Sequence, residues 1–309
     1  MWFDGQWRPW PDAAILTLGR ASSRVARQHT DGADADIRDT GAMNSMPNPF
    51  SYEGKRAAVV GGASGIGAAT AELLGQLGAD VVVLDIQAAS APGVTEIGLD
   101  LTDRESIDRA VGECGGPVDA LLSCAGVADG PLLPKINFIG QRHFIERVVE
   151  AGWMPRGSAI AMVSSAGGRG WEMNLPTLLE LIATPTYEDA VAWMEEHPDM
   201  TGYAQSKQAV CAYVARKALD FGRLGIRINA LMPGPTDTPL AQANADIWLK
   251  YASDYRSELG LGPSTAEEQA SILAFLCSPA AARIYGESIV SDAGAGVARL
   301  TGTFEPSFN

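Results

Sequence analysis

A glycine-rich segment between an expected strand and an expected helix constrains the fold of this chain more than any other feature. The segment reads Val60-Gly61-Gly62-Ala63-Ser64-Gly65-Ile66-Gly67, with the apolar run Ala57–Val60 leading into it and the helical pattern Gly65–Leu77 following. Glycines permit a tight turn and a close approach of the backbone to a ligand, and a helix N-terminus offers unpaired N–H groups. Such a strand–turn–helix unit is typical of a site for a dinucleotide pyrophosphate.

Beyond this unit, short apolar runs alternate with helical stretches. Further strands are expected at Val81–Asp85, Ala120–Cys124, Ala159–Ser164, Ile226–Leu231 and Ser288–Ser291, and further helices at Ser106–Cys114, Gly140–Ala151, Tyr203–Phe221 and Ala266–Leu276. Short buried strands that alternate with helices predict a parallel sheet with helices on both faces. We therefore expect an α/β fold, a single doubly wound parallel β-sheet of the Rossmann type, as one domain over residues 51–309.

Residues 1–50 lack this alternation. They combine several tryptophans and arginines with a later acidic run, namely Trp2, Trp7, Trp10, Arg20, Arg24, Arg27 and the stretch from Asp31 to Asp39. No apolar signal-peptide core follows Met1, and the acidic run argues against a transit peptide. We expect a disordered N-terminal extension, because the segment has no pattern that would bury a core.

An acidic residue at the end of the second expected strand completes the dinucleotide pattern. Asp85 lies eighteen positions after Gly67 (85 − 67), close to the spacing of about 20 at which a carboxylate accepts hydrogen bonds from the adenosine ribose. Such a carboxylate repels a 2′-phosphate, and no Lys or Arg occurs in the glycine loop or among residues 86–92. The sequence therefore predicts NAD(H) rather than NADP(H), bound by Gly61, Ser64, Gly65, Ile66, Gly67, Asp85 and Ile86.

A tyrosine and a lysine four positions apart are the candidate proton-transfer groups. Tyr203 and Lys207 begin the helix that follows the strand ending in Ser164-Ser165, and positions i and i+4 share one helix face. A free tyrosine has a pKa of ~10, and a nearby ammonium lowers this pKa by stabilising the phenolate. The pair is suited to exchanging a proton with an alcohol or carbonyl oxygen.

At these residues the chain resembles the short-chain dehydrogenase/reductase family, over about residues 54–297. Val60 replaces the threonine that opens the family's glycine loop, and the family's Asn-Asn-Ala-Gly element appears as Ser123-Cys124-Ala125-Gly126. The catalytic residues of the family match Asn137, Ser165, Tyr203 and Lys207, with Ser164 as the alternative position for the serine. Further matches to cofactor contacts are Asp100, Leu101, Cys124, Ala125, Gly126, Pro233, Gly234, Thr236 and Thr238.

The resemblance implies a role for each of these residues. Tyr203 would be the general acid/base, and Ser165 would hydrogen-bond the substrate oxygen. Lys207 would bind the nicotinamide ribose and lower the pKa of Tyr203, while Asn137 would position a water that links Lys207 to solvent. Asp100 would contact the adenine, and the element from Pro233 to Thr238 would bind the nicotinamide carboxamide.

The interval between the serine and the tyrosine is longer than is typical of the family, at 38 positions (203 − 165). Within it, Leu175–Ala183 is expected to form a helix capped by Asn174, and Tyr187–His197 a second helix capped by Thr186. A helical insertion over about residues 168–200 also occurs in the bacterial 3α-hydroxysteroid dehydrogenase/carbonyl reductase branch, which the chain resembles together with bacterial coniferyl-alcohol dehydrogenases. The alternative is a neutral loop insertion, because loops tolerate growth.

The expected function is oxidoreduction of a hydrophobic alcohol and its ketone with NAD(H). A 3-hydroxysteroid is the first choice of substrate, and an aryl or terpenoid alcohol is the alternative. The lid segment of the family matches residues 239–260, which carry Trp248, Tyr251 and Tyr255. These aromatics either contact a large apolar substrate or pack in the core. A non-catalytic NAD-binding regulator would not need the proton-transfer set, and an epimerase or dehydratase usually carries a larger C-terminal substrate domain.

Charge and composition narrow the partners. The formal net charge is −14, from 23 basic and 37 acidic residues, which argues against nucleic acid and anionic membranes. The four cysteines form no C-x-x-C pair and the three histidines are scattered, so no metal site is expected, and free thiols fit the cytoplasm. Because the insertion is placed to block one family interface, we expect a homodimer through Ala266–Leu276 and Ser288–Ser291, with a tetramer as the alternative.

Overall fold

The structure is a computed structural model that describes residues 2–3, 6–7, 48–89 and 91–305. The chain divides into two units, Met1–Met46 and Pro47–Asn309. In the first unit, β1 (Trp2–Phe3) pairs antiparallel with β2 (Gln6–Trp7). A disordered extension was expected over residues 1–50. Apart from these two strands, residues 1–47 of it lie outside the described residues. Pro49 already belongs to the second unit, since its carbonyl accepts a hydrogen bond from the Ala280 amide.

Among the described residues, a seven-stranded parallel sheet forms the centre of the second unit, which confirms the expected fold class. Its strands, in spatial order, are β11 (Ser288–Ser291), β8 (Arg227–Pro233), β7 (Ala159–Val163), β6 (Ala120–Ser123), β3 (Arg56–Val60), β4 (Asp80–Asp85) and β5 (Thr95–Gly98). The direction of winding reverses between β3 and β6. In open sheets of this kind, ligands bind beyond the carboxyl ends of the strands at such a reversal.

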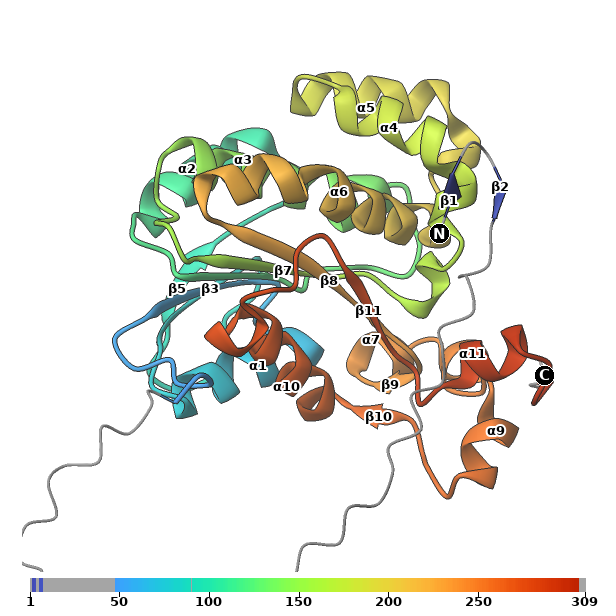
Figure 1. The fold of residues 1–309 in the computed structure, drawn as a ribbon. Helices are drawn as coiled ribbons and strands as arrows, with labels where there is room; N and C mark the ends of the chain where they lie inside the picture. Colours follow the sequence, from blue (N-terminus) through green and yellow to red (C-terminus); the bar gives the residue numbers. More distant parts are fainter. Residues whose placement is uncertain (1, 4–5, 8–47, 90, 306–309) are drawn as a thin grey trace, which may run out of the picture. The chain divides into compact units, whose positions relative to one another are not determined.

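The strands bury alternate side chains on the two faces of the sheet. In β3, Ala58 and Val60 belong to one hydrophobic cluster, and Ala57 and Val59 to the other. The first cluster includes side chains of α2 (Arg104–Cys114), α3 (Gly140–Glu150) and α6 (Tyr203–Leu224), and the second those of α1 (Gly65–Gln76) and α10 (Ala266–Cys277). Figure 1 shows these two helical layers on opposite sides of the sheet.

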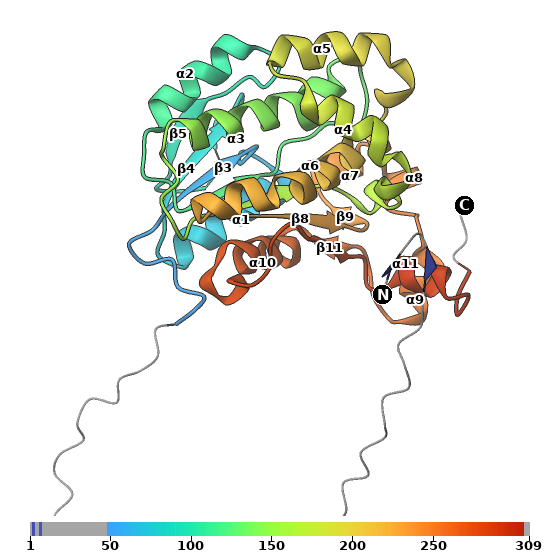
Figure 2. The same cartoon turned by 45° about the horizontal axis from the view of Figure 1, so that its top comes forward.

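The insertion folds as two helices, α4 (Leu175–Ala183) and α5 (Tyr187–Glu196), between 3₁₀ turns at Trp171–Asn174 and Pro198–Met200. The Thr186 hydroxyl caps α5 as expected, accepting a hydrogen bond from Asp189 N. Asn174 stands at the N-cap position of α4, as expected, but its side chain makes no capping hydrogen bond and donates instead to Gln208 Oε1 of α6 at 2.8 Å. Leu178, Leu181 and other insertion side chains are buried in the cluster that includes α3 and α6, so the insertion extends that helical layer (Figure 2).

Short elements follow β8. They are β9 (Thr236–Asp237), α7 (Pro239–Gln242), α8 (Ala245–Trp248), α9 (Ser253–Glu258), β10 (Ser264–Thr265), a 3₁₀ turn at Pro279–Ala281 and, after β11, α11 (Ala295–Leu300). A further 3₁₀ turn, Ala166–Gly168, follows β7. The buried guanidinium of Arg256 stabilises this segment, since it donates to the carbonyls of Leu249 (2.6 Å) and Tyr251. In the part of the chain that the structure describes, no helix is long and apolar enough to span a membrane.

Candidate active site

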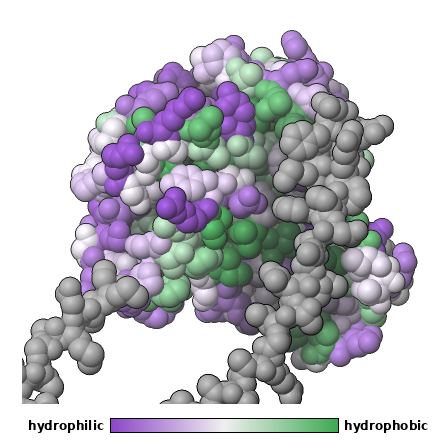
Figure 3. Space-filling model, viewed as in Figure 1, coloured by the Kyte–Doolittle hydropathy of each residue, from purple (hydrophilic) through white to green (hydrophobic). Residues whose placement is uncertain are grey.

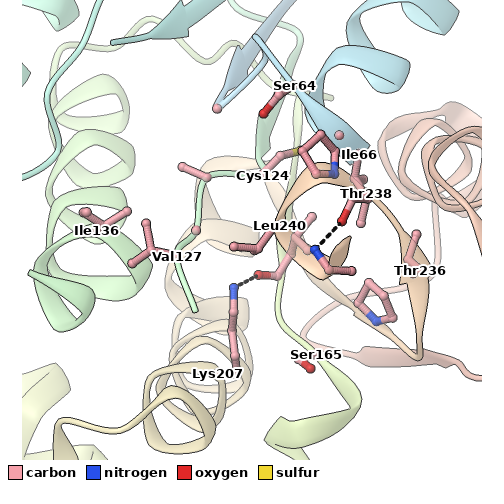
Figure 4. A pocket seen from close by; sticks show the side chains of 18 of the residues that line it. Ser64, Ile66, Cys124, Val127, Ile136, Ser165, Lys207, Thr236, Thr238 and Leu240 are labelled. Atoms are coloured by element: carbon pink, nitrogen blue, oxygen red, sulfur yellow. Dashed lines mark hydrogen bonds between the residues drawn. The ribbon is translucent and has the colours of Figure 1, made fainter. Parts of the chain in front are cut away.

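A cavity of about 560 Å³ lies at the carboxyl ends of the central strands. It collects nearly all of the predicted site residues: Gly61, Ser64, Gly65, Ile66, Asp85, Ile86, Asp100, Leu101, Cys124, Ala125, Gly126, Ser165, Tyr203, Lys207, Pro233, Gly234, Thr236 and Thr238. Of the predicted set, Gly67 and Asn137 are not in its lining. Figure 4 shows Lys207 and Ser165 at one end of the pocket and Ser64 and Ile66 at the other.

The glycine loop is shaped by contacts that leave no room for side chains. Gly61 has a φ of +76°, and a Cβ there would lie 2.5 Å from Ala125 Cα. A Cβ on Gly67 would lie 2.0 Å from the Gly61 carbonyl oxygen, so Gly67 lets α1 pack on the loop and does not face the cavity. The Ser64 side chain makes no cap hydrogen bond to α1, which leaves the first N–H groups of that helix for a ligand.

Two carboxylates lie at the end of the cavity near the glycine loop. Asp85 Oδ2 accepts a hydrogen bond from Ala63 N at 3.1 Å and Oδ1 one from Gln87 N at 3.0 Å. Asp100 Oδ1 accepts from the Thr102 amide (2.8 Å) and the Thr102 hydroxyl (2.7 Å). These bonds hold both carboxylates in place on the lining of the cavity.

Tyr203 begins α6, and its ring packs against Trp248 of α8, with centroids 4.8 Å apart. Burial raises the pKa of the phenol above its usual value, and hydrogen bonding with the Ser165 side chain opposes this in part. The Ser165 hydroxyl also accepts a hydrogen bond from Gly167 N at 3.1 Å. The phenol of Tyr203 therefore carries its proton at neutral pH. It lies next to Ser165, the serine that the family resemblance implies at the site.

Lys207 lies one turn along α6 and is 3% exposed. Its ammonium donates to the Val163 carbonyl at 3.0 Å and lies 5.7 Å from the centroid of the Tyr203 ring. Burial lowers the pKa of Lys207 to about 8. In the protein by itself burial raises the pKa of Tyr203, and the interaction that opposes this rise is with Ser165. The expected lowering of the Tyr203 pKa by Lys207 stays a prediction.

Asn137 lies in a π-helical turn, Lys135–Ile139, that leads into α3, and is fully buried. Its side chain exchanges two hydrogen bonds with the backbone of Val127 (2.8 and 3.0 Å) and donates to the Ser206 hydroxyl at 3.2 Å. Asn137 therefore ties the loop after β6 to the first turn of α6. A Cβ on Gly126 would lie 3.4 Å from Lys207 Nζ and 3.5 Å from Asn137 Oδ1. The water expected to link Asn137 and Lys207 stays a prediction.

The departure from the Asn-Asn-Ala-Gly pattern is compensated within the protein. The Ser123 hydroxyl donates to Gln141 Oε1 at 2.7 Å, and Gln141 Nε2 donates to the carbonyls of Ala125 (2.9 Å) and Ile136 (2.8 Å). The backbone bond from Cys124 N to the Val60 carbonyl, at 2.8 Å, needs neither missing family side chain. These bonds fix the loop after β6 without an asparagine pair.

The sequence identified the apolar wall of the cavity only at two lid aromatics, Trp248 and Tyr251. Its members include Val127, Ile136, Leu240, Ile247, Trp248 and Tyr251. Of the lid aromatics, Trp248 and Tyr251 line the cavity, whereas Tyr255 packs on Phe304 and donates to the Ala293 carbonyl at 3.2 Å. Contact of Trp248 or Tyr251 with a substrate stays a prediction. The aromatic content of residues 239–260 was the signal available. Among the described residues, no group of His, Cys, Asp and Glu could hold a metal ion.

Comparison with known proteins agrees with this geometry. The family model described as short chain dehydrogenase matches residues 55–175, and that described as enoyl-(acyl carrier protein) reductase matches residues 182–296. A 3-alpha-hydroxysteroid dehydrogenase/carbonyl reductase of Comamonas testosteroni is 31% identical over 251 residues, which cover 76% of this chain and 94% of that protein. The chain belongs to the short-chain dehydrogenase/reductase family.

Two further relatives lie in the same part of the family. A coniferyl-alcohol dehydrogenase of Pseudomonas sp. (strain HR199 / DSM 7063) is 29% identical over 246 residues, covering 78% of this chain and 96% of that protein. The crystal structure of the 3-alpha-hydroxysteroid dehydrogenase from Pseudomonas sp. B-0831, complexed with NADH, has a TM-score of 0.65 and 30% identity, covering 81% of this chain and 100% of that one.

Membership in the short-chain dehydrogenase/reductase family makes this chain an oxidoreductase that uses a nicotinamide cofactor. Its residues fit such a group. The glycine loop and the N-terminus of α1 suit a pyrophosphate, the carboxylates of Asp85 and Asp100 suit an adenosine, and the Lys207 ammonium suits a ribose. The cavity of about 560 Å³ that joins these groups has the size of small-molecule and cofactor sites.

Proposed function

We propose that this protein oxidises a hydrophobic alcohol to its ketone, or catalyses the reverse reduction, with NAD(H) as cofactor. The observation that carries the proposal is the single cavity that brings the proton-transfer groups Ser165, Tyr203 and Lys207 together with an apolar wall. A non-catalytic NAD-binding regulator would need the cofactor half of this cavity but no buried phenol beside a serine and a lysine.

The choice of NAD(H) over NADP(H) rests on Asp85. Its carboxylate lines the cavity, followed by Ile86 and Gln87, neither of which could neutralise a 2′-phosphate. Among the described residues of the lining, Lys207 is the one basic residue, and it follows Tyr203 at the start of α6. A 2′-phosphate beside Asp85 would meet a like charge without compensation, whereas ribose hydroxyls would find a hydrogen-bond acceptor.

The chain's own residues supply the proton chemistry. When bound, the reduced cofactor supplies the hydride that the carbonyl carbon receives. The Ser165 hydroxyl donates to the carbonyl oxygen and orients it, and the Tyr203 hydroxyl gives that oxygen its proton, so that the ketone becomes the alcohol. The Lys207 ammonium holds the nicotinamide ribose. In oxidation the one proton passes from the alcohol oxygen to Tyr203, and the hydride moves in the opposite direction to that of the reduction.

The substrate that we propose first is a 3-hydroxysteroid, with an aryl or terpenoid alcohol as the alternative. Trp248 covers Tyr203 and, with Ile247 and Leu240, gives the cavity an apolar wall on the lid side. A substrate with rigid fused or aromatic rings would bury this apolar surface on binding, and few side chains would have to become ordered. Relatives named for a 3-alpha-hydroxysteroid and for coniferyl alcohol support both classes.

The deciding experiment is turnover of a ketone panel with NADH and with NADPH. The panel contains a 3-ketosteroid, an aryl ketone, a monocyclic terpenoid ketone and a small polar ketone. We expect NADH consumption with at least one of the bulky apolar ketones and much lower kcat/KM for the polar one. Saturable NADH binding without turnover of any ketone would favour the regulator, and product isomers without net NADH consumption would favour an epimerase.

We further propose a homodimer in the cytoplasm. The strand β11 is an edge of the sheet and exposes Val290 at 36%, and Figure 3 shows apolar surface in the region of α10 and β11. The insertion packs on α3 and α6 and so occupies the alternative face. Light scattering should give a dimer that Val290→Lys converts to monomer, whereas a tetramer in the unmutated protein would contradict this assembly.

The proposed location in the cytoplasm rests on the cysteines. The four cysteines are free thiols, which suits a reducing compartment.

A further inference from the structure

We propose that Tyr187, in the insertion, is a positioning residue for the adenine end of the cofactor site and acts through the backbone carbonyl of Leu101. This inference rests on the proposed use of NAD(H). It gives the insertion a function at a site to which it contributes no lining side chain from α4 or α5.

The contact joins α5 to the segment after β5. The Tyr187 hydroxyl donates a hydrogen bond of 3.2 Å to the Leu101 carbonyl. Leu101 and its neighbours Leu99 and Asp100 line the cavity, at the end where an adenosine is expected. Tyr187 is 6% exposed, so this hydrogen bond lies below the surface of the protein.

The same carbonyl is confined from the opposite side. A Cβ on Gly140, the first residue of α3, would lie 2.2 Å from the Leu101 oxygen. Such a distance means that the α3 backbone lies directly against the oxygen and that a larger residue at Gly140 would displace it. The Leu101 carbonyl is therefore held between the start of α3 and the hydroxyl of α5.

Tyr187 can act as a fixed support because the start of α5 is itself anchored. The buried guanidinium of Arg142 donates to the carbonyls of Leu181 (3.0 Å) and Thr184 (2.7 Å), just before the helix. Glu188 pairs with Arg104 of α2 at 2.7 Å. The ring of His143 contacts the edge of Tyr187 with centroids 5.8 Å apart. These contacts come from α2 and α3, so the insertion and the cofactor half of the fold share one framework.

Removing the hydroxyl would leave a buried carbonyl unpaired and allow the segment 99–101 to relax. A binding site that must be reordered by its ligand binds more weakly than one already in place. A typical hydrogen bond corresponds to a factor of roughly 2 to 12 in an equilibrium constant. We expect Tyr187→Phe to weaken NADH binding by about 3- to 10-fold.

The experiment measures dissociation constants by calorimetry for NADH and for ADP-ribose, together with kcat at saturating NADH. ADP-ribose carries the adenosine and pyrophosphate without the nicotinamide. In Tyr187→Phe we expect the same loss of affinity for both ligands, an unchanged kcat and faster amide hydrogen exchange in residues 99–103. The matched control is Tyr52→Phe, which removes another buried phenol that donates to a backbone carbonyl, that of Ala274 at 2.6 Å, outside the cavity lining.

A purely structural Tyr187 gives a different result. Both variants would then lower the melting temperature, while both dissociation constants and the exchange of residues 99–103 stayed as in the unmutated protein. That outcome, or a loss of kcat with unchanged affinities, would overturn the proposal. Failure of the proposed function appears instead in the unmutated protein, as tighter binding of NADPH than NADH or as absent turnover. The ADP-ribose measurement still tests Tyr187 in that case.

Discussion

Removal of the Tyr203 hydroxyl tests the proposed chemistry most directly. In Tyr203→Phe the ring keeps its place against Trp248, with which it makes a contact of 4.8 Å between centroids. The hydroxyl lies in the cavity lining, and the one interaction that shifts its pKa downward is with Ser165. We therefore expect the variant to fold normally and to bind NADH as the unmutated protein does.

The size of the loss follows from the protonation state. Burial keeps the pKa of the phenol above its usual value, so at neutral pH practically every molecule carries the proton that ketone reduction needs. General acid–base catalysis is typically worth about 10²–10⁴-fold, or roughly 3–5 kcal/mol of barrier. Because the site is buried, water is a poor substitute donor, and we expect kcat for ketone reduction to fall within this range.

The assay follows NADH absorbance with a saturating apolar ketone, beside the melting temperature and the NADH dissociation constant. Tyr251→Phe is the matched control, because Tyr251 is the other tyrosine in the described cavity lining, and its kcat should stay within about threefold of the unmutated value. If Tyr203→Phe retained nearly full kcat with a normal melting temperature, Tyr203 would not be the proton donor and the catalytic assignment would have to be abandoned.

Further predictions concern cofactor choice, pH and substrate size. The unmutated protein should prefer NADH to NADPH by at least about tenfold in kcat/KM, roughly 1.4 kcal/mol, and Asp85→Ala should narrow this ratio; equal rates before mutation would refute the role of Asp85. Burial lowers the pKa of Lys207 to about 8, so the affinity for NADH should fall as pH rises through that value. Calorimetric titrations between pH 6 and pH 10 measure this change. Lys207→Met should bind NADH weakly at every pH in that range. Trp248→Ala should lower kcat/KM for bulky apolar ketones by roughly 3- to 10-fold and leave the NADH dissociation constant unchanged; an equal loss for a small polar ketone would contradict its role in substrate binding.

The arrangement of the sheet was predictable because its signals are local. Each buried strand is a short apolar run. The glycine turn from Gly61 to Gly67, between a strand and a helix, is typical of the unit that binds a dinucleotide. The strand that the sequence missed, β5 (Thr95–Gly98), shows why: it lies at the edge of the sheet and buries only Ile97, so it has no apolar run. Edge strands with one buried side chain leave little trace in a sequence.

The polar half of the site was more predictable from the sequence than its apolar half. Tyr203 and Lys207 share a helix face, and Asp85 ends a strand, so spacing along the chain nearly determines their position. Trp248 and Ile247 line the cavity from short helices, next to carbonyls of Leu249 and Tyr251 that accept hydrogen bonds from Arg256. The contact of Tyr187 with Leu101 joins positions 86 apart. Nothing in the local sequence around Tyr187 or Leu101 indicates such a contact.

Burial acts on the two titrating groups of the site in opposite directions, and both effects favour the uncharged form. For Lys207 this costs stability: its folded pKa, about 8, lies below the 10.5 of the free side chain. The unfolded chain therefore binds more protons between these values, and the stability of the fold rises with pH across that range. Below it the full penalty is present, on the order of 3 kcal/mol at 1.36 kcal/mol per pKa unit.

A lysine that only filled space could be replaced by an apolar side chain without this penalty. Its ammonium makes one backbone hydrogen bond, to Val163, which a methionine would forgo while also removing the buried charge. We therefore expect Lys207→Met to melt at a higher temperature than the unmutated protein at neutral pH, although it loses cofactor affinity. The charge on Lys207 Nζ would then lower the stability of the fold while it supports cofactor binding. Such a trade-off is typical of groups in functional sites. A lower melting temperature with intact NADH binding would make Lys207 a structural residue instead.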